Sequence, residues 1–530
     1  MSAIDKSLMC CSAFAAFASA AAAQTPDSRP NILLFMVDDM GWQDTSVPFT
    51  PVPTDNNLKY LTPNMERLAE SGMKFTQAYA CAISSPSRCS LMTGINAARH
   101  GVTNWTFRRD ISQDEVCDSI APPEWNYNGI SRVPGINNTF VGPSFVQELK
   151  DYGYHTIHIG KAHFGAVDTP GEDPHHWGFE VNVAGTAAGG LATYLSEANF
   201  GHDEAGNKLS PFAVEGLEKY WGTGTFATEA LTLEAVRELD KAKKYNQPWF
   251  LYMSHYAVHI PIDRDPRFYR KHIDRGLTEK EAAYASLVEG MDKSLGDLLD
   301  WVEENGEADN TIIIFMSDNG GLAASSYWRD GELHTQNAPL RSGKGSLLEG
   351  GIREPMIVRW PGRTRAGSEC GEYVMIEDFY PSIIEMAGID PEKSDHYGHS
   401  IDGRSFVPLI DGTGDPSADR ALIWNYPNVW GLEGPGIDLS CAIRKNEWKL
   451  IYNYATHRKE LYNIKTDIGE SRNLAADYPE VVEALSKELG ASLRAAGAGR
   501  PSVRSTGQPC PWPDEVLTIK MERGPCQPRP

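Results

Sequence analysis

The chain has 530 residues, enough for a large buried core and, by length alone, for three or four domains. Asp and Glu (71) outnumber Lys and Arg (49), which gives a formal net charge of −22. With 41% hydrophobic and 23% charged residues, the composition excludes a disordered or fibrous protein. Nucleic acid is a poor partner for so negative a chain, because like charges repel. An anionic substrate must therefore meet a local cluster of cationic side chains.

The first residues are typical of an export signal. Lys6 precedes a small-residue apolar stretch over residues 8–20, and three alanines lead to Gln24. We expect a signal peptide over residues 1–23; the alternative is a buried first helix. No later segment reaches the roughly 18 uninterrupted apolar residues that a membrane span needs, so we expect no span.

The cysteines are too few for a disulfide-built scaffold. Of nine, Cys10 and Cys11 leave with the signal peptide, and the seven that remain are an odd number. At least one mature thiol is therefore unpaired, or pairs between chains. Cys510 and Cys526 lie close together in the Pro-rich tail and are candidates for one local disulfide.

Short, continuous apolar runs alternate with helical segments along most of the chain. Such runs predict strands that are buried on both faces. The runs are residues 31–37, 156–159, 249–253 and 311–316, and the helical segments include 62–71, 144–152 and 280–305. The alternation predicts an α/β fold with a large, mainly parallel sheet flanked by helices. Ligands bind such sheets beyond the carboxyl ends of the strands.

The sequence changes character after residue 410. A stretch rich in Gly, Asp and Pro over residues 410–419 precedes three short strand-like segments and a helical segment. These are residues 421–425, 440–444, 448–452 and 479–495. We expect a catalytic domain over residues 28–410 and a smaller α+β subdomain with an antiparallel sheet, followed by a tail, over residues 420–530.

Two predicted strands end in similar polar residues. Asp38 and Asp39 follow the first strand, and Asp318 and Asn319 follow the strand that begins at Thr311. Three carboxylates and an amide form a hard oxygen set, which suits Ca²⁺ or Mg²⁺ better than zinc. The alternative is that each pair caps a turn or helix.

A Ser/Pro-rich turn opens a helix after the apolar segment at residues 75–80. Pro86 falls in the first turn, where free backbone N–H groups favour an anion. The run SSPSRCSLMTG (residues 84–94) resembles the signature [C/S]-x-P-S-R-x-x-x-[L/M]-T-G of the type I, formylglycine-dependent sulfatases, which belong to the alkaline phosphatase-like superfamily. Ser84 stands at the position of the modified residue.

Further motifs of that family follow in order, so that the resemblance covers nearly the whole mature chain. They are GKAH (160–163), AVHIP (257–261), SDNG (317–320), RSGKG (341–345), EGGIR (349–353), ELYN (460–463) and residues 470–474. Ala162 departs from the family, which usually has Trp there; this affects packing more than chemistry. The phosphate-loop reading of RSGKG fails, because Ala338 stands where that motif needs its first Gly.

The resemblance implies a nucleophile and a metal. Ser84 would be oxidised to formylglycine (3-oxoalanine), whose hydrate attacks sulfur with one hydroxyl and expels sulfate with the other. One Ca²⁺ ion would be held by this residue together with Asp38, Asp39, Asp318 and Asn319. The metal lowers the pKa of the hydrate and neutralises sulfate charge.

The resemblance also assigns the remaining catalytic roles. Lys161 and Lys344 would bind sulfate, His163 would orient the hydrated aldehyde, and His259 would protonate the departing sugar oxygen. Arg88 would fix the turn that carries residue 84. Without the resemblance, Lys161 and His163 would be read as a surface pair.

Together these inferences predict an exported enzyme that hydrolyses sulfate esters of a carbohydrate, acting from the chain end on a galactose-type sugar. The Ser-type motif implies a maturase of the radical type that acts before export, and the bacterial periplasm or the medium as location. Trp, Arg and His side chains in loops are candidate sugar contacts, with ordinary packing as the alternative. They are Trp105, Arg108, Arg109, His175, His176 and Arg353.

Two other functions stay open at this point. One is a phosphate or phosphonate ester hydrolase that uses Ser84 unmodified; an oxygen-only metal set argues against it, because such relatives more often bind two metals with His ligands. The other is an inactive glycan-binding homologue. The complete set of Lys161, His259 and Lys344 argues against loss of catalysis.

Overall fold

A computed structural model describes residues 29–245, 247–323, 335, 337–390, 394, 396–431 and 434–516. The signal peptide expected over residues 1–23 lies outside these residues, as do Cys10, Cys11 and Cys526. Among the described helices, none is long and apolar enough to cross a bilayer.

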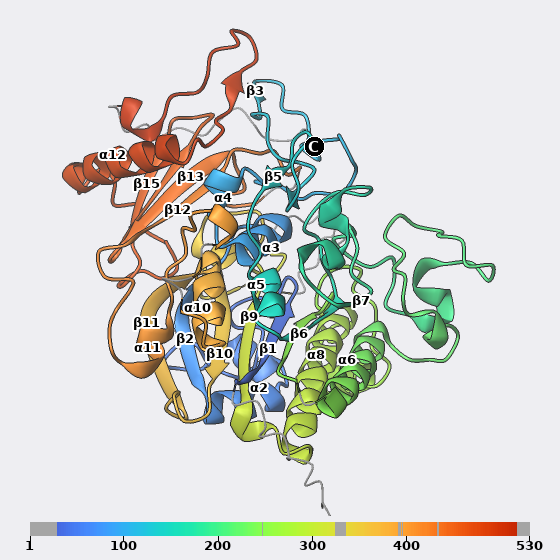
Figure 1. Cartoon of the computed structure of the whole chain (residues 1–530). Coiled ribbons are helices and arrows are strands. Elements are labelled where there is room, and N and C mark those ends of the chain that lie inside the picture. Colours follow the sequence, from blue (N-terminus) through green and yellow to red (C-terminus); the bar gives the residue numbers. More distant parts are fainter. Residues whose placement is uncertain are drawn as a thin grey trace, which may run out of the picture.

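The centre of the molecule is a large mixed sheet, to which the described residues contribute eight strands in the order β11-β2-β10-β9-β1-β8-β6-β7 (Figure 1). The strands are β1 (Asn31–Val37), β2 (Met73–Tyr79), β6 (His155–Gly160), β7 (Val181–Val183), β8 (Trp249–Ser254), β9 (Thr311–Ser317), β10 (Arg353–Arg359) and β11 (Ser368–Met375). Only β10 runs antiparallel to its neighbours β2 and β9 among these strands. The predicted mainly parallel sheet is therefore confirmed, and β1, β6, β8 and β9 lie within two residues of their predicted bounds.

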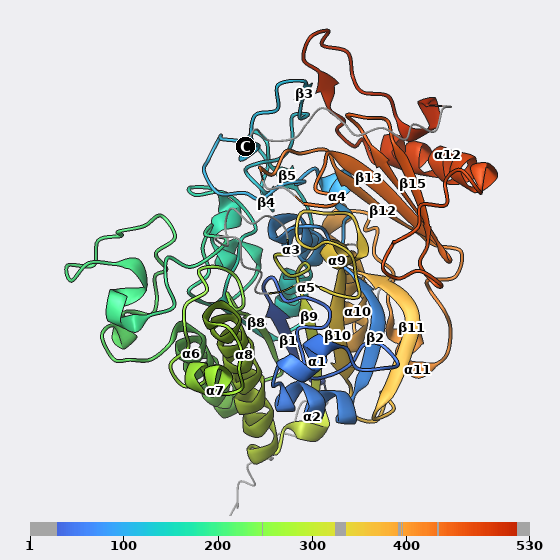
Figure 2. The ribbon, with the colours of Figure 1, turned by 180° about the vertical axis from the view of Figure 1, so that it is seen from behind.

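Alternate residues of β1 enter two different cores, as the period of two in a strand requires. Ile32, Leu34 and Met36 pack with α3, α5 and α10, whereas the intervening residues of β1 pack with α2, α6 and α8. These helices are α2 (Pro63–Ser71), α3 (Ser84–Thr93), α5 (Phe145–Asp151), α6 (Ala227–Tyr245), α8 (Glu279–Glu304) and α10 (Phe379–Met386). The sheet is thus buried on both faces, and Figure 2 shows it from behind.

A second, antiparallel sheet lies at one end of the large one (Figure 1). Its described strands are β12 (Ala421–Tyr426), β13 (Ser440–Lys445), β14 (Trp448–Asn453) and β15 (Lys459–Asn463). Helix α12 (Pro479–Ala495) covers it, and the two share a core of their own. The predicted antiparallel C-terminal sheet and its helix are confirmed.

A buried ionic cluster joins the second sheet to the chain that precedes β10. The Nζ of Lys449, on β14, lies 2.9 Å from the carboxylate of Glu349 in α9 (Glu349–Ile352) and 3.0 Å from that of Glu470. Glu470 also accepts a hydrogen bond from the backbone N–H of Glu349. All three residues are buried, so the two sheets are tied together next to the loop that carries Lys344.

The suggested disulfide between Cys510 and Cys526 is wrong. Cys510 is a buried, free thiol. Among the cysteines that the structure describes, Cys117 is the one in a disulfide bond. Proximity in sequence was misleading here, because the Cys510 side chain points into the core between α12 and the second sheet.

Candidate active site

Four neighbouring parallel strands carry polar residues to one edge of the large sheet. In sheet order these are β9, β1, β8 and β6, and their carboxyl ends lead into Asp318, Asp38, the turn with His259, and Lys161. Parallel strands end on the same side, so residues far apart in sequence meet there. The structure brings these four residues together with Ser84.

The carboxylates of Asp38, Asp39 and Asp318 form a buried cluster. One oxygen from each lies within 4.8 Å of the others, and Oδ2 of Asp39 has no hydrogen-bond partner. Asn319 adds an amide whose Nδ2 lies 2.8 Å from Oδ1 of Asp39. Oxygen donors of this kind, one of them buried and unsatisfied, fit a hard divalent cation.

Asp39 and His163 both have left-handed backbone conformations, with φ of 60° and 58°. This region is unfavourable for residues with a Cβ, and such strain gathers at functional sites. At Asp39 this backbone conformation lets the consecutive carboxylates of Asp38 and Asp39 both join the acidic cluster at the end of β1. Burial raises the pKa of Asp39, but the nearby Lys344 and His259 outweigh burial and lower it overall.

Ser84 is the first residue of α3 and is buried. Its Oγ lies 3.2 Å from Oδ1 of Asp38, 3.1 Å from Oδ1 of Asn319 and 3.1 Å from Nζ of Lys161. The α3 N-terminus adds free N–H groups and a positive dipole end. The side chain at residue 84 thus lies between the acidic cluster and a cation.

Arg88 is one turn further along α3 and is also buried. Its Nε and one terminal nitrogen each lie 2.8 Å from Oδ2 of Asp318, and its other terminal nitrogen donates to Ser254 and to the carbonyl of Lys161. The guanidinium therefore fastens α3 to the ends of β9, β8 and β6. That Arg88 fixes the turn with residue 84 stays a prediction.

Lys161 and Lys344 each form an ion pair with a different carboxylate of the cluster. Nζ of Lys161 lies 2.7 Å from Asp38, and Nζ of Lys344 lies 2.6 Å from Asp39. Burial lowers the pKa of Lys161 to about 8, although Asp38 opposes this. Burial also acts to lower the pKa of Lys344, but Asp39 and Asp38 outweigh it and raise that pKa. Lys161 also contacts Ser84, and sulfate binding by the two lysines stays a prediction.

The two predicted histidines occupy different positions. Nε2 of His163 lies 3.0 Å from Oγ of Ser85 and 2.9 Å from the carbonyl oxygen of Thr106, so it contacts Ser85 rather than Ser84. Its Nδ1 is buried without a hydrogen-bond partner. Burial, with Lys161 and Arg88 nearby, holds the pKa of His163 well below its usual value.

His259 is partly open, with 17% of its side chain exposed, and faces the cluster. Its Nδ1 lies 2.7 Å from the carbonyl oxygen of Ile260, and Nε2 lies 3.7 Å from Oδ2 of Asp39. The carbonyl can only accept, so Nδ1 is the donor and Nε2 is left to exchange protons with a ligand. Burial, then Lys344, lowers the pKa of His259, and Asp39 partly offsets them.

The loop candidates are spread over different environments. Thr106 binds both Ser85 and His163, which anchors the half-buried Trp105 beside the site. Arg109 is exposed and donates to the carbonyl oxygen of Asp168. The remaining loop candidates are exposed: Arg108, His175 and His176.

The structure gives Arg353 an interior place. It is 5% exposed, its guanidinium lies over the Trp42 ring at 4.4 Å, and it donates to Glu349 and to the carbonyl oxygen of Thr76. Its donors are used by the protein, so a role in sugar contact has no support here. Sequence analysis missed Thr106, which contacts His163 through its backbone carbonyl oxygen and Ser85 through its backbone N–H and its hydroxyl.

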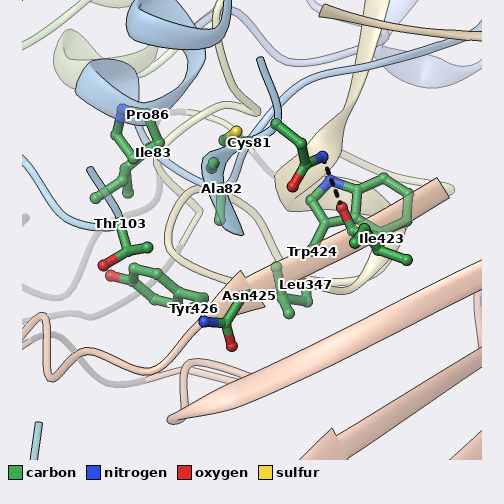
Figure 3. Close-up of a pocket in the computed structure, with 12 residues that line it drawn as sticks. Cys81, Ala82, Ile83, Pro86, Thr103, Leu347, Ile423, Trp424, Asn425 and Tyr426 are labelled. Carbon is green, nitrogen blue, oxygen red and sulfur yellow. Dashed lines mark hydrogen bonds between the residues drawn. The ribbon is translucent and has the colours of Figure 1, made fainter. Parts of the chain in front are cut away.

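Figure 3 shows a narrow cavity behind the start of α3, between residues 81–86 and β12. Its lining includes Ile83, Leu347 and Trp424, and no charged residue. A sulfate would find no cation in it. The cavity is a packing gap between the two sheets, and Lys161 and Lys344 lie outside it, at the acidic cluster.

Known proteins that are similar to this chain identify its family. A sulfatase family model matches residues 30–389, more than half of the chain. The chain belongs to the sulfatase family. A second model, described as the C-terminal part of N-sulphoglucosamine sulphohydrolase, matches residues 343–495.

The relatives of this sulfatase span most of its length. A sulfatase of Formosa agariphila is 29% identical over 87% of each chain, and human N-acetylgalactosamine-6-sulfatase is 27% identical over 86% of this chain and 84% of its own. The solved structure of Ps i-CgsB in complex with k-i-k-neocarrahexaose has a TM-score of 0.68, with 26% identity over 88% of this chain and 93% of that one. The protein is thus a sulfuric ester hydrolase of the type I, alkaline phosphatase-like group, as its motifs predicted.

Proposed function

We propose that this sulfatase is exported and removes sulfate from a carbohydrate, acting from the chain end on a galactose-type sugar. The observation that carries the proposal is the placement of Ser84 within 3.1 Å of Lys161, at the edge of a buried acidic cluster. The human relative named for N-acetylgalactosamine and the neighbour with a bound neocarrahexaose support a sugar substrate. A small cationic pocket in a chain of net charge −22 favours one terminal sulfate over a long polysulfated chain.

We propose Ca²⁺ as the metal, held by Asp38, Asp39, Asp318, Asn319 and residue 84. The donor set is all oxygen, and one carboxylate oxygen of Asp39 has no partner of its own. When bound, the ion would neutralise charge on the sulfate and favour the ionised form of the nucleophile. Conversion of Ser84 to formylglycine would supply an aldehyde hydrate with two hydroxyls, one to attack sulfur and one to release sulfate.

The side chains of the site divide the remaining work. Lys161, which contacts Ser84, and Lys344, which pairs with Asp39, would bind sulfate oxygens, which stabilises the charge that develops during transfer. His259 would hold a proton on Nε2 and give it to the sugar oxygen as the S–O bond breaks. His163, which contacts the adjacent Ser85, would orient the hydrated residue 84, and Arg88 would keep α3 in place.

We further propose that a radical maturase modifies Ser84 before export to the periplasm or medium. The Ser-type motif and the N-terminal stretch support this. We also propose the division into a catalytic domain over residues 28–410 and a C-terminal subdomain and tail over residues 420–530. The segment between α11 (Val407–Asp411) and β12, which contains no helix or strand, supports that boundary.

The test is hydrolysis of a panel of sulfated galactose-type monosaccharides, which differ in sulfate position, by protein co-expressed with a radical maturase. We expect turnover of at least one sugar, loss of activity in Ser84→Ala, and normal activity in Ser71→Ala, a surface control. Hydrolysis of phosphate esters without that of sulfate esters would contradict the proposal and favour the phosphate or phosphonate ester hydrolase. Sugar binding without any turnover would favour the inactive glycan-binding homologue.

A further inference from the structure

A segment outside the recognised motifs, residues 184–194, lies against both active-site histidines. A Cβ added to Gly189 would lie 2.4 Å from Cε1 of His163 and 2.7 Å from its Nε2. A Cβ added to Gly190 would lie 2.9 Å from Nδ1 of His259 and 3.0 Å from its Cε1. Two consecutive glycines thus touch the two imidazole rings with their backbone.

The close approach of the imidazole rings, rather than the backbone conformation, explains why residues 189 and 190 are glycines. Neither Gly189 nor Gly190 has a φ in the left-handed region, which is where glycine is otherwise preferred. Separations of 2.4 to 2.9 Å are shorter than carbon atoms tolerate, so any side chain here would push an imidazole aside. The absence of a side chain therefore sets where each ring lies.

Hydrogen bonds fasten the segment to the chain on either side of His163 and His259. Near its start, the carbonyl oxygen of Thr186 accepts from the N–H of His163 at 3.1 Å. Near its end, the hydroxyl of Tyr194 lies 2.9 Å from the carbonyl oxygen of His259 and 2.7 Å from that of Tyr256.

Three further hydrogen bonds hold the segment in place. The hydroxyl of Tyr256 donates to the carbonyl oxygen of Ala184 at 2.8 Å. The carboxylate of Asp263 accepts from the N–H of Tyr194 at 2.8 Å and from the hydroxyl of Thr193 at 2.7 Å. The segment is thus hydrogen-bonded at both ends, on either side of Gly189 and Gly190.

We propose that Gly189 and Gly190 are positioning residues that set the two histidines separately, Gly189 on the nucleophile side and Gly190 on the leaving-group side. The inference rests on the proposed function. In that reaction the electron pair of the breaking S–O bond stays on the sugar oxygen, which takes the proton from Nε2 of His259. Displacement of His259 must therefore affect poor leaving groups more than good ones.

The test compares a sulfated monosaccharide, whose alcohol leaves poorly, with 4-nitrophenyl sulfate, whose acidic phenol needs little protonation. We expect Gly190→Ala to lower kcat for the sugar sulfate about 100-fold, the lower end of what general acid catalysis contributes, and to change kcat for the aryl sulfate far less. Gly189→Ala should lower kcat for both substrates to a similar extent. Gly371→Ala is the matched control, because nothing lies within 4 Å of the added Cβ, and it should change neither.

Tyr194→Phe provides a second variant that removes only the hydroxyl bound to the His259 turn. It should show the same selective loss on the sugar sulfate as Gly190→Ala, and in a His259→Gln background Gly190→Ala should add no further loss. Equal losses on both substrates in Gly190→Ala and Tyr194→Phe, or full activity in both, would overturn the inference. A wild-type protein that turns over neither substrate would instead overturn the proposed function.

Discussion

The Nζ of Lys344 lies 2.6 Å from Oδ1 of Asp39, although the two residues are 305 positions apart. The loop with Lys344 precedes β10, and Asp39 follows β1. The contact puts a cation from one motif beside a predicted metal ligand from another. It joins the acidic cluster and one of the two proposed sulfate-binding lysines in one site.

The metal can be tested by removal. Because a ligand that binds only the folded state stabilises it, calcium at 100 times its Kd should add about 2.7 kcal/mol to the free energy of unfolding. A chelator should therefore lower the thermal midpoint of the wild-type protein, and calcium should restore it. In Asp39→Asn we expect at least about tenfold weaker binding and a smaller shift. Calorimetry measures both quantities, with the exposed Asp55→Asn as control; a shift of the same size in Asp39→Asn would contradict this assignment.

The buried ionic cluster between the two sheets should matter for stability. Lys449 forms ion pairs with both Glu349 and Glu470, and all three are fully buried. Lys449→Met removes the cation paired with the buried Glu470, while Glu349 keeps Arg353, and should cost about 3–5 kcal/mol of unfolding free energy. Lys487→Met removes the partner of the exposed Glu483 and should leave stability essentially unchanged. Urea unfolding followed by fluorescence measures both, and equal effects would show that Lys449 is not needed for charge balance.

The free energy of unfolding should decrease as the solution is acidified, because of His158. The ring of His158 is packed among Phe164, Phe179 and Tyr252. Burial, with Arg88 nearby, lowers the pKa of His158 to about 3 from 6.5. The unfolded chain therefore binds the proton more readily, so stability contributed by the neutral ring is present above pH 6.5 and is lost as pH falls toward 3. His158→Phe should flatten the dependence of unfolding free energy on pH in this window. A slope identical to that of wild type would contradict the assignment.

Much of the fold could be predicted because buried parallel strands carry a strong local signal. β1 matches residues 31–37 as predicted, since all seven of its residues are buried. β10 and β11 were missed. β10 contains Arg353, Glu354 and Pro355, and the first half of β11 is largely exposed and includes a Gly, so neither is a continuous apolar run.

The candidate site was predictable where chemistry lies in side chains of a known motif, as for Ser84 and Asp318. It was not predictable where the backbone acts. Gly189 and Gly190 leave room for the imidazole rings because they have no side chain, and Thr106 contributes a carbonyl oxygen. The position of Arg353 depends on long-range packing against Trp42, which no local pattern reveals.

The most direct test of the central claim is the mass of the peptide over residues 75–88, which trypsin releases after Lys74 and Arg88 and which contains Ser84. It should be measured together with sugar-sulfatase activity, in protein made with and without a radical maturase. We predict that the peptide loses the mass of two hydrogen atoms when the maturase is present, and that activity rises in proportion to the converted fraction. Full sulfatase activity in protein whose residue 84 is entirely unmodified serine would contradict the account.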